Sequence, residues 1–333
     1  MSPPKNLNKL LCCLLLIFSQ ITLYAQRTAD KPLYRDPVYD GAADPTIIWN
    51  REEQKWFMFY TNRRANLDSI DGVSWVHGTR IGIAESSDGG ATWKYRDTCD
   101  IQYRLQEYTH WAPEVIEYDG LYHMFLTYVP GIFTDWKHPR YIVHLTSKNL
   151  INWKFESQLQ LATDKVIDAC VFLMPNGIWR MFYNNEKDHK SIYFADSPDL
   201  YHWTDSSKKV VSEPGEGPYV FEWKSRYWMI VDNWRGIGVY RSDDLTNWVK
   251  QEKRLLEKPG TGKDDQVMGN HASVVVSNDR AFIIYFTHPG RIPENKGTNS
   301  YETRRSSIQI AELEYLDGQI ICNRDKPVMI NLK

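Results

Sequence analysis

The chain has 333 residues, of which 42% are hydrophobic and 14% aromatic, so it can bury a sizeable core in one large domain or two smaller ones. Its formal net charge of −2 and isoelectric point near 6.5 exclude the broad basic surface that nucleic acids require. We therefore expect no nucleic-acid partner.

The N-terminus has the pattern of a cleaved secretory signal peptide over residues 1–25. Lys5 and Lys9 precede an apolar run from Leu10 to Phe18, and the small residue Ala25 suits the cleavage site. An uncleaved membrane anchor is the alternative. No second apolar stretch of membrane-spanning length follows, so we expect no membrane association after cleavage. The sequence thus predicts a secreted protein, periplasmic or extracellular, with a lead-in segment over residues 26–39.

One short signature recurs through the remaining chain at intervals of 45 to 60 residues. Each copy follows an apolar, β-prone stretch, is rich in the Ser, Asp, Asn and Gly of turns, and ends in a Trp that begins another strand. The four copies are Ser87–Trp93, Ser147–Trp153, Ser197–Trp203 and Ser242–Trp248.

Two further strands precede each signature. The turns Asp119-Gly120 and Asn176-Gly177 lie between apolar runs, which is a strong hairpin signal. A fifth unit, 268–325, lacks the Trp. Four strands per unit at this period predict an all-β, five-bladed β-propeller over residues 40–325, with four-stranded antiparallel blades. The blades are expected at 40–97, 108–158, 164–208, 214–253 and 268–325. A two-sheet sandwich is the rival fold, but it does not explain the regular unit length.

In four of the five units a polar residue stands where the first strand begins. First strands line the central channel of a propeller, so these residues are expected to converge on one face. Asp44, Asp168 and Glu216 occupy blades one, three and four at what reads as matching register. A lone acid there could be a turn or strand cap, but three converging carboxyls repel one another and raise one another's pKa. That arrangement suits general acid–base catalysis.

The order and spacing of these motifs resemble glycoside hydrolase family 43 and its five-bladed relatives. The resemblance covers residues 40–320 and rests on four short motifs: Asp44-Pro45, Trp111-Ala112-Pro113-Glu114, Asp168 within an apolar strand, and Glu216-Gly217-Pro218. It implies a glycosidase that inverts anomeric configuration, with Asp44 as general base, Glu216 as general acid and Asp168 as the residue that orients the acid and modulates its pKa. Such a reaction needs one protonated and one ionised carboxyl group on opposite faces of the sugar.

Four more residues are candidate substrate contacts: Trp111, His110, Trp234 and Arg305. Trp111 can stack on a sugar or pack between blades, and Arg305 can instead be a solvated surface residue. The resemblance also suggests that His271 lies near a calcium ion in the central channel; otherwise no cofactor is required. Glu114 reads as a structural hydrogen-bonding partner.

The long polar stretch from Thr61 to Gly78 is expected to reshape the pocket and to favour exo-action on terminal sugars. The expected substrate is an oligosaccharide or polysaccharide of plants or algae, with α-L-arabinofuranosides first and β-xylosides or galactosides next. Alternatives are a non-catalytic carbohydrate-binding propeller, a protein-interaction propeller and a glycoside phosphorylase. Cys99, Cys170 and Cys322 do not reveal a disulfide pairing.

Overall fold

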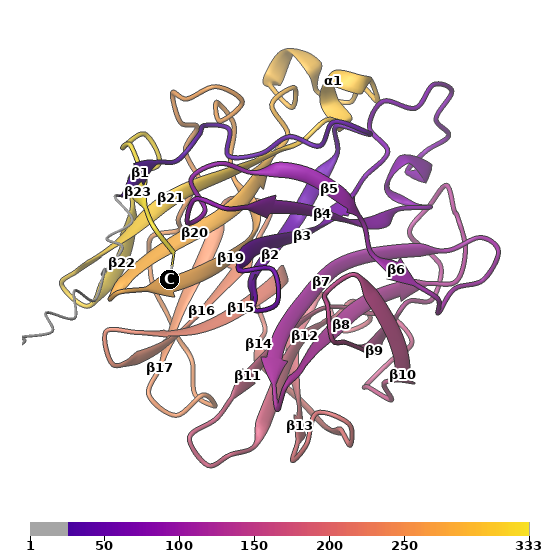
Figure 1. The fold of residues 1–333 in the computed structure, drawn as a ribbon, viewed down its shortest axis with the longest axis vertical. Coiled ribbons are helices and arrows are strands. Elements are labelled where there is room, and N and C mark those ends of the chain that lie inside the picture. The colour runs from indigo at the N-terminus through magenta and orange to yellow at the C-terminus, as the bar shows by residue number, and fades with distance from the viewer. Residues whose placement is uncertain (1–25, 333) are drawn as a thin grey trace, which may run out of the picture.

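The computed structural model describes residues 26–332, which form five four-stranded antiparallel sheets arranged around a centre (Figure 1). The predicted five-bladed propeller is confirmed, and the sandwich is excluded. In chain order the blades are β2 (Ala42–Asn50), β3 (Lys55–Asn62), β4 (Arg80–Ser86) and β5 (Lys94–Thr98); β7 (Thr109–Tyr118), β8 (Leu121–Val129), β9 (Tyr141–Ser147) and β10 (Asn152–Gln158); β11 (Val166–Leu173), β12 (Trp179–Asn185), β13 (Ser191–Ser197) and β14 (Thr204–Val211); β15 (Glu216–Trp223), β16 (Arg226–Asp232), β17 (Ile237–Ser242) and β18 (Val249–Lys250); β19 (Asn270–Ser277), β20 (Arg280–Thr287), β21 (Ser307–Leu316) and β22 (Gln319–Cys322).

Short elements complete the chain. The strand β6 (Asp100–Ile101) pairs in parallel with β10 at the outer edge of blade two. The helical turns are η1 (Ser74–Val76), η2 (Pro293–Asn295) and α1 (Tyr301–Arg304). Within residues 26–332 no helix has the length and hydropathy needed to cross a membrane. The three cysteines of this region are free thiols. The predicted signal peptide, residues 1–25, lies outside the described residues.

The repeated Trp signature forms the turn between the third and fourth strands of a blade. In blade three, Asp199 accepts the backbone N–H groups of Tyr201 and His202, and the indole of Trp203 donates to the Leu200 carbonyl at 2.7 Å. Leu200 has a positive φ of 71°. The same left-handed position recurs at Leu150, Leu245 and Gly90, so the signature encodes one turn geometry in four blades.

The two ends of the described chain close the ring. The strand β1 (Arg27–Thr28) pairs with β23 (Met329–Ile330), and Tyr34 bridges to Ile308 on β21. Side chains of blades one and five pack with both terminal segments in a single core cluster that includes Leu33 and Ile330. Because blades one and five exchange no strand, this packing seals the junction between them.

The start of every inner strand is irregular, and this irregularity places the functional side chains. In all five blades the pairing of the first two strands shifts register within the first few residues, as in a β-bulge. Asp44, Ala112, Asp168 and Gly217 take positive φ values there. Glu216 therefore stands one residue before the position of Asp44 and Asp168, so the predicted matching register is wrong by one residue for Glu216.

Candidate active site

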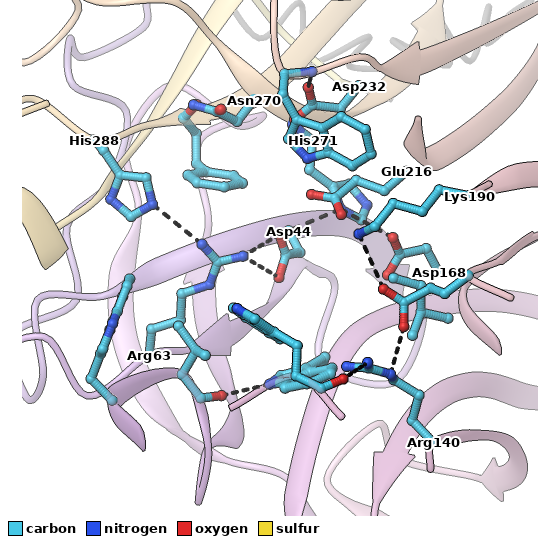
Figure 2. A pocket seen from close by; sticks show the side chains of 18 of the residues that line it. Asp44, Arg63, Arg140, Asp168, Lys190, Glu216, Asp232, Asn270, His271 and His288 are labelled. Carbon is cyan, nitrogen blue, oxygen red and sulfur yellow. Dashed lines mark hydrogen bonds and ion pairs between the residues drawn. The ribbon is translucent and has the colours of Figure 1, made fainter. Parts of the chain in front are cut away.

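A cavity of about 480 Å³ opens where the five inner strands begin, and residues of all five blades line it. We call it the central cavity. Its wall combines tryptophans with an unusual number of ionisable side chains, several of which are shown in Figure 2. Acidic and basic groups both converge on this space, as the sequence predicted for its carboxylates.

The three predicted carboxylates all line the central cavity. Asp44 and Asp168 are buried, with 5% and 6% of their surface exposed, and Glu216 is partly exposed. His271 lies between the two aspartates, with its Nδ1 atom 3.4 Å from Asp44 and 4.0 Å from Asp168. Residues separated by more than 170 positions in sequence thus share one wall.

Asp44 is held as an anion. Both of its carboxylate oxygens accept hydrogen bonds from Nη2 of Arg63, at 3.0 and 3.2 Å, and Arg63 is fixed from the other side by His288 (Figure 2). Burial by itself raises the pKa of Asp44, but the charges of Arg63 and His271 and hydrogen bonds outweigh it and leave the pKa below its ordinary value. Asp44 can therefore polarise a water molecule at neutral pH.

The pKa values of Asp168 and Glu216 are raised, opposite to that of Asp44. Burial and the charge of Asp44 raise the pKa of Asp168 to about 8. Burial and the charge of Asp168 raise the pKa of Glu216. Asp168 also accepts the N–H of Gly217 at 3.0 Å, which fixes the backbone beside Glu216. This pair therefore disfavours two negative charges and retains a proton.

Asp232 is a fourth carboxyl group in the cavity, and the sequence analysis missed it. It is 1% exposed and accepts the N–H groups of His271 at 2.8 Å and Trp234 at 2.7 Å. Burial and the charge of Glu216 raise its pKa to about 7. Asp232 pairs with Glu216 across the β15–β16 hairpin, so the strand register could have revealed it.

The place of Asp232 in its blade is held by a threonine, Thr61 or Thr127, in blades one and two. Thr61 and Thr127 pair with the corresponding first-strand positions of blades one and two. Their hydroxyls accept the N–H groups of Ala112 and Asp168, each on the next blade. Asp232 does the same for blade five, so its structural task is to link neighbouring blades, and its charge adds to the acidic cluster.

Two cations and a further glutamate were also missed. Glu186 forms ion pairs with Nε of Arg140 at 2.6 Å and with Nζ of Lys190 at 3.1 Å, and Lys190 lies 4.9 Å from the ring centre of Trp234. The turn that carries Lys190 is strained, because both His189 and Lys190 have positive φ values. The Lys190 charge opposes the rise in the pKa of Glu216, which makes it a candidate modulator of the acid.

Trp111 and Trp234 line the central cavity as predicted, beside Trp75 and Trp136. The Trp111 indole donates to the Val76 carbonyl at 2.6 Å and its ring centre lies 5.9 Å from that of Trp136. Trp111 therefore packs between loops and still presents surface to the cavity, and its stacking on a sugar stays a prediction. Aromatic faces of this kind suit the apolar faces of a ligand ring.

Two predicted substrate contacts are wrong in position. His110 is 2% exposed, packs against Tyr108 and Tyr128, and lies outside the cavity wall. Arg305 pairs with Asp264 at 3.1 Å and Glu302 at 2.8 Å and also lies outside the wall. Of its acidic partners, Asp264 lies in a distant loop and Glu302 in α1. The position of Arg305 just before β21 in the sequence could not reveal this pairing.

The calcium ion expected near His271 stays a prediction. Calcium takes six to eight oxygen ligands, and within residues 26–332 no group of three or more His, Cys, Asp or Glu side chains has a metal-binding arrangement. His271 Nδ1 instead faces the carboxylate oxygens of Asp44 and Asp168, which suits a hydrogen-bond donor.

Comparisons with known proteins agree with this geometry. Residues 112–277, from blade two to blade five, match the model of the glycosyl hydrolases family 32 N-terminal domain. No curated protein matches the sequence significantly. Among solved structures, a thermostable family 43 glycoside hydrolase is 19% identical with a TM-score of 0.66, covering 90% of this chain and 99% of the other.

Two further structures are similar over comparable lengths. An exo-1,5-α-L-arabinanase from a bovine ruminal metagenomic library is 15% identical with a TM-score of 0.63, covering 88% of this chain and 100% of the other. A family 43 enzyme from Xanthomonas citri, complexed with xylose, is 15% identical with a TM-score of 0.63, covering 89% and 92%. At these identities the structures establish a common fold.

Proposed function

We propose that this chain, a propeller glycosidase similar to families 43 and 32, is an inverting, exo-acting enzyme that removes terminal sugars from plant or algal polysaccharides. Asp44 acts as general base, Glu216 as general acid, and Asp168 orients the acid and raises its pKa. An α-L-arabinofuranoside is the first candidate substrate, followed by a β-xyloside or a galactoside.

One observation carries the proposal: carboxyl groups in a single cavity have pKa values shifted in opposite directions. Arg63 and His271 keep the pKa of Asp44 low, whereas burial and Asp168 raise that of Glu216. At neutral pH Asp44 is ionised while the Asp168–Glu216 pair retains a proton. Glycoside inversion requires this pairing, because an acid must protonate the leaving oxygen while a base activates water on the opposite face.

Exo-action is supported by the loops around the cavity. The N–H of Val73 donates to the Thr134 carbonyl at 3.0 Å, and the amide of Asn299 donates to the Gly72 carbonyl at 3.0 Å. Arg304 adds a bond to the Ala65 carbonyl at 2.9 Å. These contacts join the loops 61–78, 130–140 and 288–306 into one connected rim along blades five, one and two. A rim of this kind favours a pocket for a chain end over an open cleft.

The candidate sugars come from similar proteins and from the predicted export signal. The similar structures include an exo-arabinanase, an enzyme complexed with xylose and an exo-β-1,3-galactanase. A secreted enzyme of this class would meet polysaccharide outside the cell. The non-catalytic carbohydrate-binding alternative would have no use for carboxyl groups with opposed pKa shifts.

The test is a screen of aryl α-L-arabinofuranoside, β-D-xyloside and β-D-galactoside, with the anomer of the first-formed product identified by NMR. Glu216→Gln should abolish turnover of substrates with poor leaving groups and slow activated aryl glycosides much less, because these need little acid assistance. Asp44→Asn should lose activity on both. Equal loss in Glu216→Gln on both substrate types, or a retained anomer, would refute the assignment.

A further inference from the structure

Arg291 stands where the central cavity meets a second pocket. This side pocket has a volume of about 230 Å³ and shares Asn270, His288 and Arg291 with the central cavity. The rest of its wall is largely apolar and includes Val267, Met268, Ile292 and Pro293. A ligand that fills the central cavity and extends beyond it would therefore pass Arg291.

The charge of Arg291 is not compensated by the protein. Arg63 pairs with Asp44, and Arg140 and Lys190 both pair with Glu186. By contrast, within residues 26–332 no carboxylate lies within ion-pair distance of Arg291. The side chain of Arg291 is exposed where the two pockets meet, and the charge of Arg63 acts against its own, which lowers the pKa of Arg291. Arg63, whose charge acts on Arg291, is itself already paired with Asp44.

The guanidinium of Arg291 is nevertheless held in place. Its Nε donates to the Thr303 carbonyl at 3.1 Å, and its backbone N–H closes a turn onto the His288 carbonyl at 2.9 Å. His288 is an unsuitable anion partner, because its Nδ1 donates to the Arg305 carbonyl, and its Nε2 accepts from Arg63. One edge of the Arg291 guanidinium is therefore anchored, and its two terminal nitrogens remain for a ligand.

We propose that Arg291 binds an anionic substituent, a carboxylate or a sulfate ester, on the saccharide that enters the central cavity. A planar guanidinium matches such groups with two parallel hydrogen bonds. The acidic group relieves the repulsion between Arg291 and Arg63, and the apolar side pocket receives the remainder of that sugar unit. This inference rests on the proposed glycosidase function, since it assigns that site an acidic saccharide.

Binding measured by calorimetry on the full mature chain tests the inference without requiring turnover. The probes are two matched pairs, D-galacturonate with D-galactose and D-glucuronate with D-glucose, together with D-galactose 6-sulfate and inorganic phosphate. At least one acidic sugar should bind about 10- to 100-fold more tightly than its neutral partner, and added salt should weaken that preference. Which acidic sugar binds distinguishes carboxylate from sulfate.

Arg291→Gln should reduce the acidic preference to within about threefold while leaving neutral-sugar affinity unchanged, and Arg291→Lys should restore part of it. Arg241→Gln, a change on β17 outside the cavity, is the matched control and should keep the full preference. Thermal melting confirms that each variant is folded.

The inference is overturned if no acidic sugar is preferred, if Arg291→Gln keeps the preference, or if only inorganic phosphate binds. Absence of hydrolysis with intact acidic-sugar binding would instead count against the proposed function.

Discussion

At the scale of single residues, the site shows how identical groups acquire different chemistry. Asp44 and Asp168 occupy the same position in their blades, yet Arg63 lowers the pKa of the first while burial and Asp44 raise that of the second. The neighbours, and not the residue type, decide which carboxyl holds a proton. Lys190 is the cation placed to adjust this division.

Replacing Lys190 by Met should move the alkaline limb of the kcat/KM profile to higher pH by about one unit. The sign follows from charge: Lys190 lowers the pKa of Glu216, so its removal lets the acid keep its proton to higher pH. The acidic limb, set by Asp44, should stay in place. Lys187→Met, in the same turn but paired with Asp164, should leave both limbs unchanged. An alkaline limb that stays or moves down contradicts the role.

Glu114 offers a separate test through stability. Burial raises its pKa to about 8, and it is 6% exposed in the channel. A carboxyl whose pKa is raised on folding stabilises the protein fully below its unfolded pKa, and this contribution is lost as pH rises toward 8. Glu114→Gln should therefore flatten the fall in unfolding free energy between about pH 5 and 8, gaining on the order of 1–4 kcal/mol at the upper end.

Urea unfolding across this pH range measures the effect. Glu117→Gln, on the exposed part of the same strand, should follow the parent protein. If the unfolding free energies of Glu114→Gln and the parent protein change in parallel with pH, the titration of the buried carboxyl is not linked to folding.

At the scale of elements, bulges and loops shape the site. The pairing shifts at the start of each inner strand, as in a β-bulge. A regular strand would direct the side chains there sideways, and the bulge turns them toward the central cavity. The rim depends on Arg304, which is 7% exposed and donates to the carbonyls of Ala65, Leu67 and Asn299. One buried guanidinium thus joins two loops.

Arg304→Ala should loosen this rim, because three carbonyls lose their charged donor. We expect faster amide hydrogen exchange in the loops 63–68 and 298–305 and a several-fold higher KM with little change in kcat, since the carboxylates stand on strands. Lys296→Ala, at an exposed position of the same loop, is the control. Unchanged exchange in loop 63–68 would show that Arg304 does not hold it.

At the scale of the whole molecule, the ring is stable only if blades one and five are joined. The terminal segments perform this task, and side chains of β23 alternate between core and solvent: Ile330 is 1% exposed and Met329 is 39% exposed. The junction therefore depends on a few buried side chains near the end of the chain.

Ile330→Ala should destabilise the protein by roughly 2–5 kcal/mol, because it leaves a cavity in the cluster that joins the two blades. Met329→Ala, one residue earlier on the exposed face, should change the unfolding free energy by no more than about 0.5 kcal/mol. Urea unfolding of both variants provides the comparison, and similar losses would mean that β23 does not seal the ring.

The sequence by itself determined the fold and the three central carboxylates. A repeated turn signature and hairpin signals are local, so they specify blades wherever the chain later places them. The convergence of Asp44, Asp168 and Glu216 followed from blade symmetry alone. The single-residue offset of Glu216 could not be predicted in this way, because it depends on where the bulge falls in each inner strand.

Only the tertiary structure decided the partners of those carboxylates. Asp232, Glu186 and Lys190 lie at strand ends or in a strained turn with no distinctive local pattern. Asp232 lies beside Glu216 through the pairing of β15 with β16, whereas Glu186 and Lys190 belong to blade three and reach the same cavity through the packing of blades three and four. His110 and Arg305 were misplaced for the same reason, since a side chain's direction depends on contacts far away in sequence. Protonation states follow from burial and neighbouring charge, which exist only once the ring has closed.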